Sequence, residues 1–241
     1  MRISIVVPAF NEEKILGATL AQIKSACGAF APVGWETELI VCDNNSTDRT
    51  AAIAQAAGAI VVFEPVNQIS RARNTGAARA TGDWLVFVDA DSRPGTGLFA
   101  DMIEQIRSGD CLAGGATLQW DRKHLPISWM MPLLNAGFRW RRLLHGAFIF
   151  IETATFRQLG GFSIETFSGE DWELSLRLNQ RAKESNRRFV ILYRHPIVTS
   201  GRRFGDYSVL TPFKVLYRTI FVPRRIQISR EAARRWYDRR R

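Results

Sequence analysis

The sequence predicts an α/β fold built on a mostly parallel sheet with helices on both faces. Short apolar runs rich in β-branched residues alternate with amphipathic stretches from the N-terminus to residue 90, beginning with ISIVVP and EEKILGATLAQIKSA and ending with DWLVFVDA. Polar residues follow three of the predicted strands, in PAFNE, CDNNSTD and DAD. Because ligands of such sheets bind beyond the carboxyl ends of the strands, we expect these three loops to line one crevice.

Capping residues define the predicted helices. Asn11 is expected to cap the helix that starts with EEKILG, and Ser46 or Thr47 the helix DRTAAIAQ. Gly58 and Gly82 stand where C-terminal caps belong. After residue 95 the pattern predicts a helix in GLFADMIEQIRSG, a strand in CLAGGATLQW, and a bulky segment, LPISWMMPLLNAGFRWRRLLHGAFIFI, that is either core or an apolar acceptor surface.

Length and composition predict one large domain with an extension. The chain has 241 residues, of which 46% are hydrophobic, enough for a core. We expect a domain over residues 1–205, with a nucleotide-binding half (1–95) and an acceptor and catalytic half (96–205), and a C-terminal helical, basic, aromatic extension over 206–241. The three cysteines have no metal-ligand spacing and are typical of buried thiols in a reducing compartment. No apolar run suits a signal peptide or approaches the roughly 18 residues of a spanning helix, which favours a cytoplasmic location.

Two acids end the apolar run VFVDADSRP. Residues two apart in an extended strand point to the same side, so Asp89 and Asp91 can converge on one point if the backbone stays extended. Paired carboxylates need a cation, and oxygen ligands with few protein contacts suit Mg²⁺ or Mn²⁺ shared with a phosphate-bearing substrate. The alternative is a capped turn at the strand end.

A second acidic pair opens a predicted helix in SGEDWELSLRL. Glu170 and Asp171 fall in its first turn, where the helix dipole favours carboxylates whether or not they serve a reaction. The apolar side of this helix is expected to be Trp172, Leu174, Leu176 and Leu178.

Five motifs in order resemble the family-2 glycosyltransferases, which have the GT-A fold and use nucleotide-activated sugars. They are VPAFNEE, VCDNNSTDRT, SRARNTGAARATGDWLVFVDAD, GAFIFIETATFRQLGGF and GEDWELSLRL. Each motif alone is weak evidence, but the ordered set is specific and covers roughly residues 2–205.

The resemblance implies a nucleotide site. The first loop cradles the nucleoside, Asp43 bonds the base, and Arg73 lies near the base and diphosphate. In the D-x-D, Asp89 reaches the ribose beside Ala90, and Asp91 ligates the metal. The residues that match the first loop are Pro8, Ala9, Phe10 and Glu12. The alternatives are an Asx-type turn for Asp43 and a solvated helix face for Arg73.

The resemblance also implies the chemistry. Glu170 and Asp171 match the catalytic loop, with Asp171 as the general base that takes the proton of an acceptor hydroxyl. A single displacement by one base implies inversion, and the metal and arginines neutralise the departing diphosphate. The donor is expected to be a UDP-sugar. Glycines in GGF, at residues 160–162, match the flexible loop before this site.

Three further cationic or ligand-type residues follow in YRHPIVTSGRRF. His195 is expected to bind metal or phosphate or to be structural. Arg202 and Arg203 either clamp phosphate as planar donors or belong to a solvated tail.

The tail carries most of the charge. Residues 202–241 hold twelve Lys and Arg against three Asp and Glu, a net of +9 out of +10 for the chain. Its apolar content favours packing combined with contact to an anionic membrane surface over packing alone, and nucleic-acid binding is least favoured because no recognition motif is present. A peripheral place on the inner face of the plasma membrane suits a lipid-linked acceptor.

Three other function classes fit these sequence features less well. A non-catalytic nucleotide-sugar-binding or scaffold protein of the same fold would not need the D-x-D acids together with Glu170 and Asp171. A nucleic-acid-binding protein would depend on the tail alone. A dinucleotide oxidoreductase is excluded, because PAFNEE stands where the G-x-G-x-x-G turn is needed.

Overall fold

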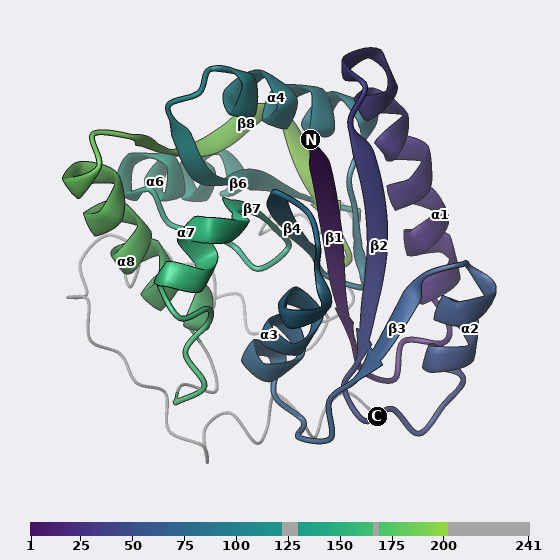
Figure 1. Cartoon of the computed structure of the whole chain (residues 1–241). Coiled ribbons are helices and arrows are strands. Elements are labelled where there is room, and N and C mark those ends of the chain that lie inside the picture. The colour runs from purple at the N-terminus through teal and green to yellow at the C-terminus, as the bar shows by residue number, and fades with distance from the viewer. Residues whose placement is uncertain (122–129, 166–168, 202–241) are drawn as a thin grey trace.

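The computed structural model describes residues 1–121, 130–165 and 169–201. Its centre is an eight-stranded sheet of order β3-β2-β1-β4-β7-β6-β8-β5. The first four strands in this order, β3 (Ile60–Phe63), β2 (Glu36–Asp43), β1 (Arg2–Ala9) and β4 (Trp84–Val88), are parallel. The predicted α/β class and the parallel N-terminal half are therefore confirmed (Figure 1).

The second half of the sheet is mixed. β7 (Phe148–Glu152) runs antiparallel to both β4 and β6 (Cys111–Trp120), while β8 (Arg188–Thr199) is parallel to β6. The two-residue strand β5 (Ser92–Arg93) pairs antiparallel with the end of β8. This short strand follows the D-x-D directly, so it ties the segment after β4 to the end of β8.

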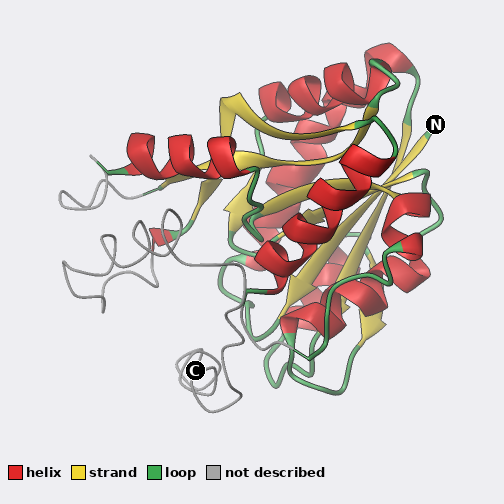
Figure 2. Ribbon diagram, turned by 90° about the vertical axis from the view of Figure 1, so that its left-hand side faces the viewer, coloured by secondary structure: helices red, strands yellow, loops and turns green. Residues whose placement is uncertain are grey.

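Helices cover both faces of the sheet (Figures 1 and 2). One face packs against α1 (Leu16–Ala26), the 3₁₀ helix η1 (Cys27–Val33), α2 (Thr50–Ala56) and α4 (Thr96–Arg107). The other packs against α3 (Ile69–Arg79), α7 (Thr153–Gln158) and α8 (Glu170–Glu184). The central strands are therefore buried on both sides, which explains their nearly continuous apolar sequence. Within the described ranges, no helix has the length and hydrophobicity needed to cross a membrane.

One helix packs on a small cluster of its own. The inner face of α6 (Met131–Arg141) contributes Leu134 and Phe138, which pack with Leu143 and with the side chain of Trp172 on α8. Part of the bulky segment is therefore core, which is one of the two alternatives that the sequence leaves open for it.

The predicted N-caps were wrong. Asn11 has a left-handed backbone, with φ of 51°, and α1 begins only at Leu16. The second helix is capped neither by Ser46 nor by Thr47, because the Oδ1 atom of Asp48 accepts the N–H of Thr50 at 2.9 Å. Both candidate caps are instead used in the loop contacts described below.

The two predicted C-cap glycines differ. Gly58 follows α2 with φ of 70°, as expected of a left-handed cap. Gly82 is not a cap, because α3 ends at Arg79; a Cβ atom at Gly82 would lie 2.6 Å from the Oγ of Ser4. Glycine is required there by the close approach of β1 and not by the helix end.

The apolar face of α8 also differs from the prediction. Its buried side chains are Leu174, Ser175, Leu178 and Ala182, at the spacing of three to four that a helix requires, while Trp172 and Leu176 are only partly buried. The predicted set alternated at spacing two, which is the period of a strand.

The cysteines are unpaired thiols. Burial raises the pKa of Cys42 to about 12 and the pKa of Cys27 and of Cys111 to about 11. All three thiols are therefore protonated and chemically quiet near neutral pH.

Candidate active site

The loops that follow β1 and β2 form one wall. Ala9 lies opposite Asp43 in the parallel register, and its carbonyl accepts the N–H of Asn44 at 2.8 Å. The Oδ1 of Asn11 accepts the N–H of Thr47 at 2.8 Å, and the Oγ of Ser46 accepts the N–H of Asn11 at 3.0 Å. Two loops more than thirty residues apart are thus held together at the carboxyl edge of the sheet, as the sequence predicted.

Two acids of this wall are buried, Glu12 and Asp43, each 6% exposed. The Oδ1 of Asp43 accepts the N–H of Ser46 at 3.1 Å, which is the Asx-type turn considered as its alternative. Pro8 and Ala9 are buried at the end of β1, and Phe10 is partly exposed. The nucleoside contacts expected of these residues stay a prediction.

The D-x-D segment is a turn. The N–H of Ser92 donates to the carbonyl of Asp89 at 2.9 Å, so the backbone does not stay extended and the condition for convergence along a strand is not met. Ala90 is 5% exposed and belongs to the same hydrophobic core as Leu16 of α1 and Leu98 of α4, and its contact with a nucleotide stays a prediction. The turn gives the two acids different surroundings.

Asp89 points to a buried arginine. Arg73 of α3 is 1% exposed, and its two terminal nitrogens bind separate acids: Nη2 lies 2.9 Å from Oδ1 of Asp89, and Nη1 lies 2.8 Å from Oε1 of Glu170. Burial alone lowers the pKa of Arg73, but these carboxylates outweigh it and raise the pKa above its ordinary value. Arg73 is therefore not part of a solvated helix face, and it joins the end of β4 to the start of α8.

The guanidinium is enclosed by two further groups. It lies over the ring of Phe162, 5.1 Å from the centroid, and its Nη2 donates to the carbonyl of Gly146 at 3.3 Å. A Cβ at Gly146 would sit 2.3 Å from Nη2. Phe162 is itself fixed by both hydrogen bonds of its backbone to the side-chain amide of Asn74, at 2.8 and 2.9 Å. The GGF loop is thus anchored here by α3.

Asp171 sits beside this network at the start of α8. Its Oδ2 accepts the N–H of Gly146 at 3.0 Å and its Oδ1 accepts the N–H of Trp172 at 2.9 Å. Loss of solvation raises the pKa of Asp171 above its ordinary range, the charge of Glu170 raises it further, and Arg73 opposes both. A carboxylate held in place by two backbone donors, with a raised pKa, is a candidate general base.

Sequence reasoning missed Gly146, Phe162, Asn74 and His145. His145 precedes Gly146 and packs edge-on against Phe138, with ring centroids 3.6 Å apart. Burial lowers its pKa to about 3, so the ring is neutral, and its Nε2 has no hydrogen-bond partner among the described residues. Its one sequence signal is a His-Gly pair between two apolar runs, which does not indicate a site.

Of the remaining residues predicted to bind metal or phosphate, one packs against α4 and two lie outside the residues that the structure describes. His195 contacts α4, with its Nδ1 3.0 Å from Oδ2 of Asp101 and its ring against Gly97. Arg202 and Arg203 lie outside the described residues, which end at Gly201.

The acids suit a divalent metal that takes most of its ligands from substrate and water. Asp91 is 8% exposed and follows the strand end, whereas Asp89 is engaged by Arg73. Over residues 1–121, 130–165 and 169–201, no group of three or more His, Cys, Asp or Glu side chains forms a closed metal cage. Mg²⁺ is usually bound by a few protein oxygens together with the phosphates of the substrate.

The sequence pattern of glycosyl transferase family 2 matches residues 4–160, which is more than half of the chain. The chain belongs to glycosyl transferase family 2. The match includes the loops after β1 and β2, the turn at Asp89, and Gly146, whose N–H donates to Asp171. It ends before α8, which carries Asp171 itself.

Relatives in Mycobacterium tuberculosis extend this finding. An uncharacterised glycosyltransferase is 32% identical over 139 residues, and the alignment covers 58% of this chain and 58% of that protein. The chain thus spans less than two thirds of that relative. A PGL/p-HBAD biosynthesis glycosyltransferase is 26% identical over 225 residues, covering 85% of this chain and 78% of the relative.

Several solved structures share the fold. Residues 1–349 of TarS from S. aureus superpose with a TM-score of 0.66 at 21% identity, covering 96% of this chain and 73% of that one. A mannosyltransferase from Pyrobaculum calidifontis, solved with GDP-Man and Mn²⁺, gives 0.66 at 18% identity, with 92% and 69% covered. Glucosyl-3-phosphoglycerate synthase of M. tuberculosis, solved with Mn²⁺, UDP-Glc and phosphoglyceric acid, gives 0.59 at 20%, with 92% and 80% covered.

Replacing Arg73 tests its structural role. Arg73→Met leaves two carboxylates without their cation, one of them buried, so the free energy of unfolding is expected to fall by about 3 to 5 kcal/mol. The matched control is Arg49→Met, because the exposed pair of Arg49 with Glu13 should contribute less than about 1 kcal/mol. Urea unfolding measures both, and equal losses would contradict the assignment.

Proposed function

We propose that this protein transfers a sugar from a nucleoside diphosphate donor to an acceptor hydroxyl with inversion at the anomeric carbon. The observation that carries the proposal is the position of Asp171, bound by the N–H groups of Gly146 and Trp172 beside the Arg73 network. The membership of glycosyl transferase family 2 supports the reaction class.

Asp171 serves as the base in this proposal. An alcohol is a poor nucleophile near neutral pH, so a carboxylate must accept its proton as the hydroxyl attacks the anomeric carbon and the bond to the diphosphate breaks. The two backbone donors orient the carboxylate, and the raised pKa brings its proton affinity toward neutral pH. One base acting in one displacement leads to inversion.

The proposed role of Arg73 differs from the one first expected. A guanidinium that is 1% exposed and shared by two acids is a poor partner for a diphosphate. It is better placed to hold Asp89 at the ribose side and Glu170 beside the base, so Glu170 is proposed as a support of the catalytic helix. The free oxygen of Asp89 remains for a ribose hydroxyl.

A divalent ion held by Asp91 would neutralise the charge that grows on the departing diphosphate. The similar structures solved with GDP-Man and Mn²⁺, and with UDP-Glc and Mn²⁺, support a nucleotide-sugar donor and Mn²⁺ as the first ion to test. TarS solved with UDP-GlcNAc supports a uridine donor as the first nucleotide to test.

The acceptor is proposed to be lipid-linked, and the protein to work as a cytoplasmic enzyme at the inner face of the plasma membrane. The support is the composition of residues 206–241, where nine Arg and one Lys are mixed with Phe, Leu, Ile, Tyr and Trp. Those residues lie outside the described part of the chain.

Removing the base tests the reaction. Asp171→Asn is expected to slow hydrolysis of a UDP-sugar in the presence of Mn²⁺ by about 100- to 10,000-fold, because water or acceptor then loses its proton acceptor. Glu184→Gln, at the other end of α8 and exposed, is the matched control and should keep the native rate. Full activity of Asp171→Asn would refute the assignment of the base, and an inactive native protein across UDP- and GDP-sugars would refute the proposed function.

The pH dependence of kcat/KM tests the surroundings of Asp171. The base works only when deprotonated, so the rate should fall with decreasing pH at values above the ordinary aspartate pKa of about 4. Glu170→Gln removes the negative neighbour and should move this acid limb to lower pH, whatever its effect on the maximal rate. An acid limb near pH 4 in the native protein, or one unmoved by Glu170→Gln, would contradict the account.

Metal binding is tested apart from catalysis. UDP should raise the melting temperature, and Mn²⁺ added with UDP should raise it further, because ligands that bind only the folded state stabilise it. Asp91→Asn is expected to keep the shift from UDP and lose the increment from Mn²⁺. Asp83→Asn, an exposed acid at the opposite end of β4, is the control. An undiminished Mn²⁺ increment in Asp91→Asn would exclude this acid as the ligand.

A further inference from the structure

The outer face of α6 carries large apolar side chains that are exposed to solvent. It exposes large apolar side chains, with Leu133 54% and Trp140 75% exposed, and these lie seven residues apart with the exposed Ala136 between them. That spacing places all three on one stripe of the helix. The opposite stripe is buried through Leu134 and Phe138, so α6 is apolar on two sides, and one of them has no protein cover among the described residues.

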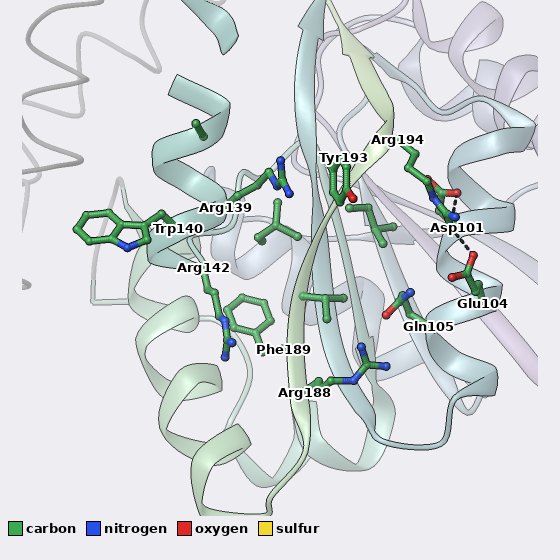
Figure 3. A pocket seen from close by; sticks show the side chains of 14 residues that line it. Asp101, Glu104, Gln105, Arg139, Trp140, Arg142, Arg188, Phe189, Tyr193 and Arg194 are labelled. Carbon is green, nitrogen blue, oxygen red and sulfur yellow. Dashed lines mark hydrogen bonds and ion pairs between the residues drawn. The ribbon is translucent and has the colours of Figure 1, made fainter. Parts of the chain in front are cut away.

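Arginines border this stripe. Arg139 lies over the ring of Tyr193 on β8, with its guanidinium carbon 3.7 Å from the ring centroid, and Tyr193 is 56% exposed. Arg142 follows the helix and is exposed. Figure 3 shows Arg139 reaching toward Tyr193 in the groove that Trp140 also lines. We call Leu133, Ala136, Arg139, Trp140, Arg142 and Tyr193 the α6 surface.

The stretch of sequence that contains α6 carries positive charges only. Residues 122–151 contain five Lys and Arg and no Asp or Glu. The nearest acids of the structure across the groove, Asp101 and Glu104 of α4, are already paired with Arg194. The groove, of about 700 Å³, separates them from α6. The α6 surface therefore presents a net positive charge with an apolar stripe.

We propose that the α6 surface docks the protein on an anionic lipid bilayer. Exposed Trp and Tyr side chains are characteristic of the membrane–water interface, and arginines that flank an apolar stripe match acidic headgroups beside acyl chains. Charge complementarity selects the bilayer over a second copy of this chain, because two α6 surfaces in contact would bring like charges together.

The surface connects directly to the candidate active site. Phe138, on the inner side of α6, packs on the ring of His145 and on Trp172, with ring centroids 6.4 Å apart in the second pair. Trp172 is the residue after Asp171, and its backbone N–H donates to the carboxylate of Asp171. A bilayer on the outer face of α6 would thus be separated from the proposed base by the helix and the side chains under it, which deepens and rests on the proposed transfer to a lipid-linked acceptor.

Vesicle sedimentation of the full chain tests the surface. Native protein should bind vesicles of phosphatidylcholine with about one third phosphatidylglycerol, bind pure phosphatidylcholine less, and release as salt rises. The double variant Leu133→Ser/Trp140→Ser should lose about tenfold in binding to the anionic vesicles. The C-terminal extension is the same in both proteins and cannot cause that difference.

The control removes a matched pair of apolar side chains elsewhere. Phe63 on β3 and Val66 after it are 59% and 42% exposed, and Phe63→Ser/Val66→Ser should bind vesicles like the native protein. Lipids brominated near the headgroup should quench part of the native tryptophan fluorescence, and Trp140→Phe should lose that part. Donor hydrolysis without vesicles should be native in all these variants.

Four results would overturn the proposal. These are no binding of the native protein to anionic vesicles, unchanged binding by the α6 double variant, equal loss in the β3 control, or a dimer in solution that Trp140→Ser abolishes. If the native protein hydrolyses no donor, the proposed function fails, but the vesicle measurements still decide whether the α6 surface docks on a bilayer.

Discussion

A single buried guanidinium holds the two functional parts of this protein together. Arg73 is 1% exposed, and removing its charge from water costs several kcal/mol unless that charge is paired. Asp89 lies at the end of β4 and Glu170 at the start of α8. The two acids that pair with Arg73 are therefore 81 residues apart in the sequence and belong to different elements. The cost of burying Arg73 is offset only when these elements are in place, which makes their relative position a condition of folding.

The small residues around Arg73 follow from this constraint. Gly146 has no space for a side chain beside Nη2, and the same residue donates its N–H to Asp171. Gly160 and Gly161, with φ of 76° and 74°, let the chain turn into Phe162, whose ring covers the guanidinium. The end of β4, the glycine loop before Phe162 and the start of α8 therefore meet at one cation, and a shift in one of them moves the surroundings of the candidate base.

The α/β class, the parallel half of the sheet and the meeting of three loops were predictable, because hydrophobic period and strand ends are local properties of the sequence. Asn11 and Gly82 show where local rules fail: Asn11 bonds a loop 36 residues away, and Gly82 is needed by the backbone of β1. The burial of Arg73 is not predictable from the sequence, because its two partners lie 16 and 97 residues away. The turn at Asp89 depends on Ser92, which is drawn into a pairing with the distant strand β8.

The structure of the complex with UDP and Mn²⁺ tests the central claim most directly, because it reports where Arg73 points when a diphosphate is present. The account predicts that the guanidinium stays within hydrogen-bonding distance of both Asp89 and Glu170, as at 2.9 and 2.8 Å here, while the diphosphate and the metal lie at Asp91. An Arg73 side chain that leaves Glu170 and binds the diphosphate would contradict it.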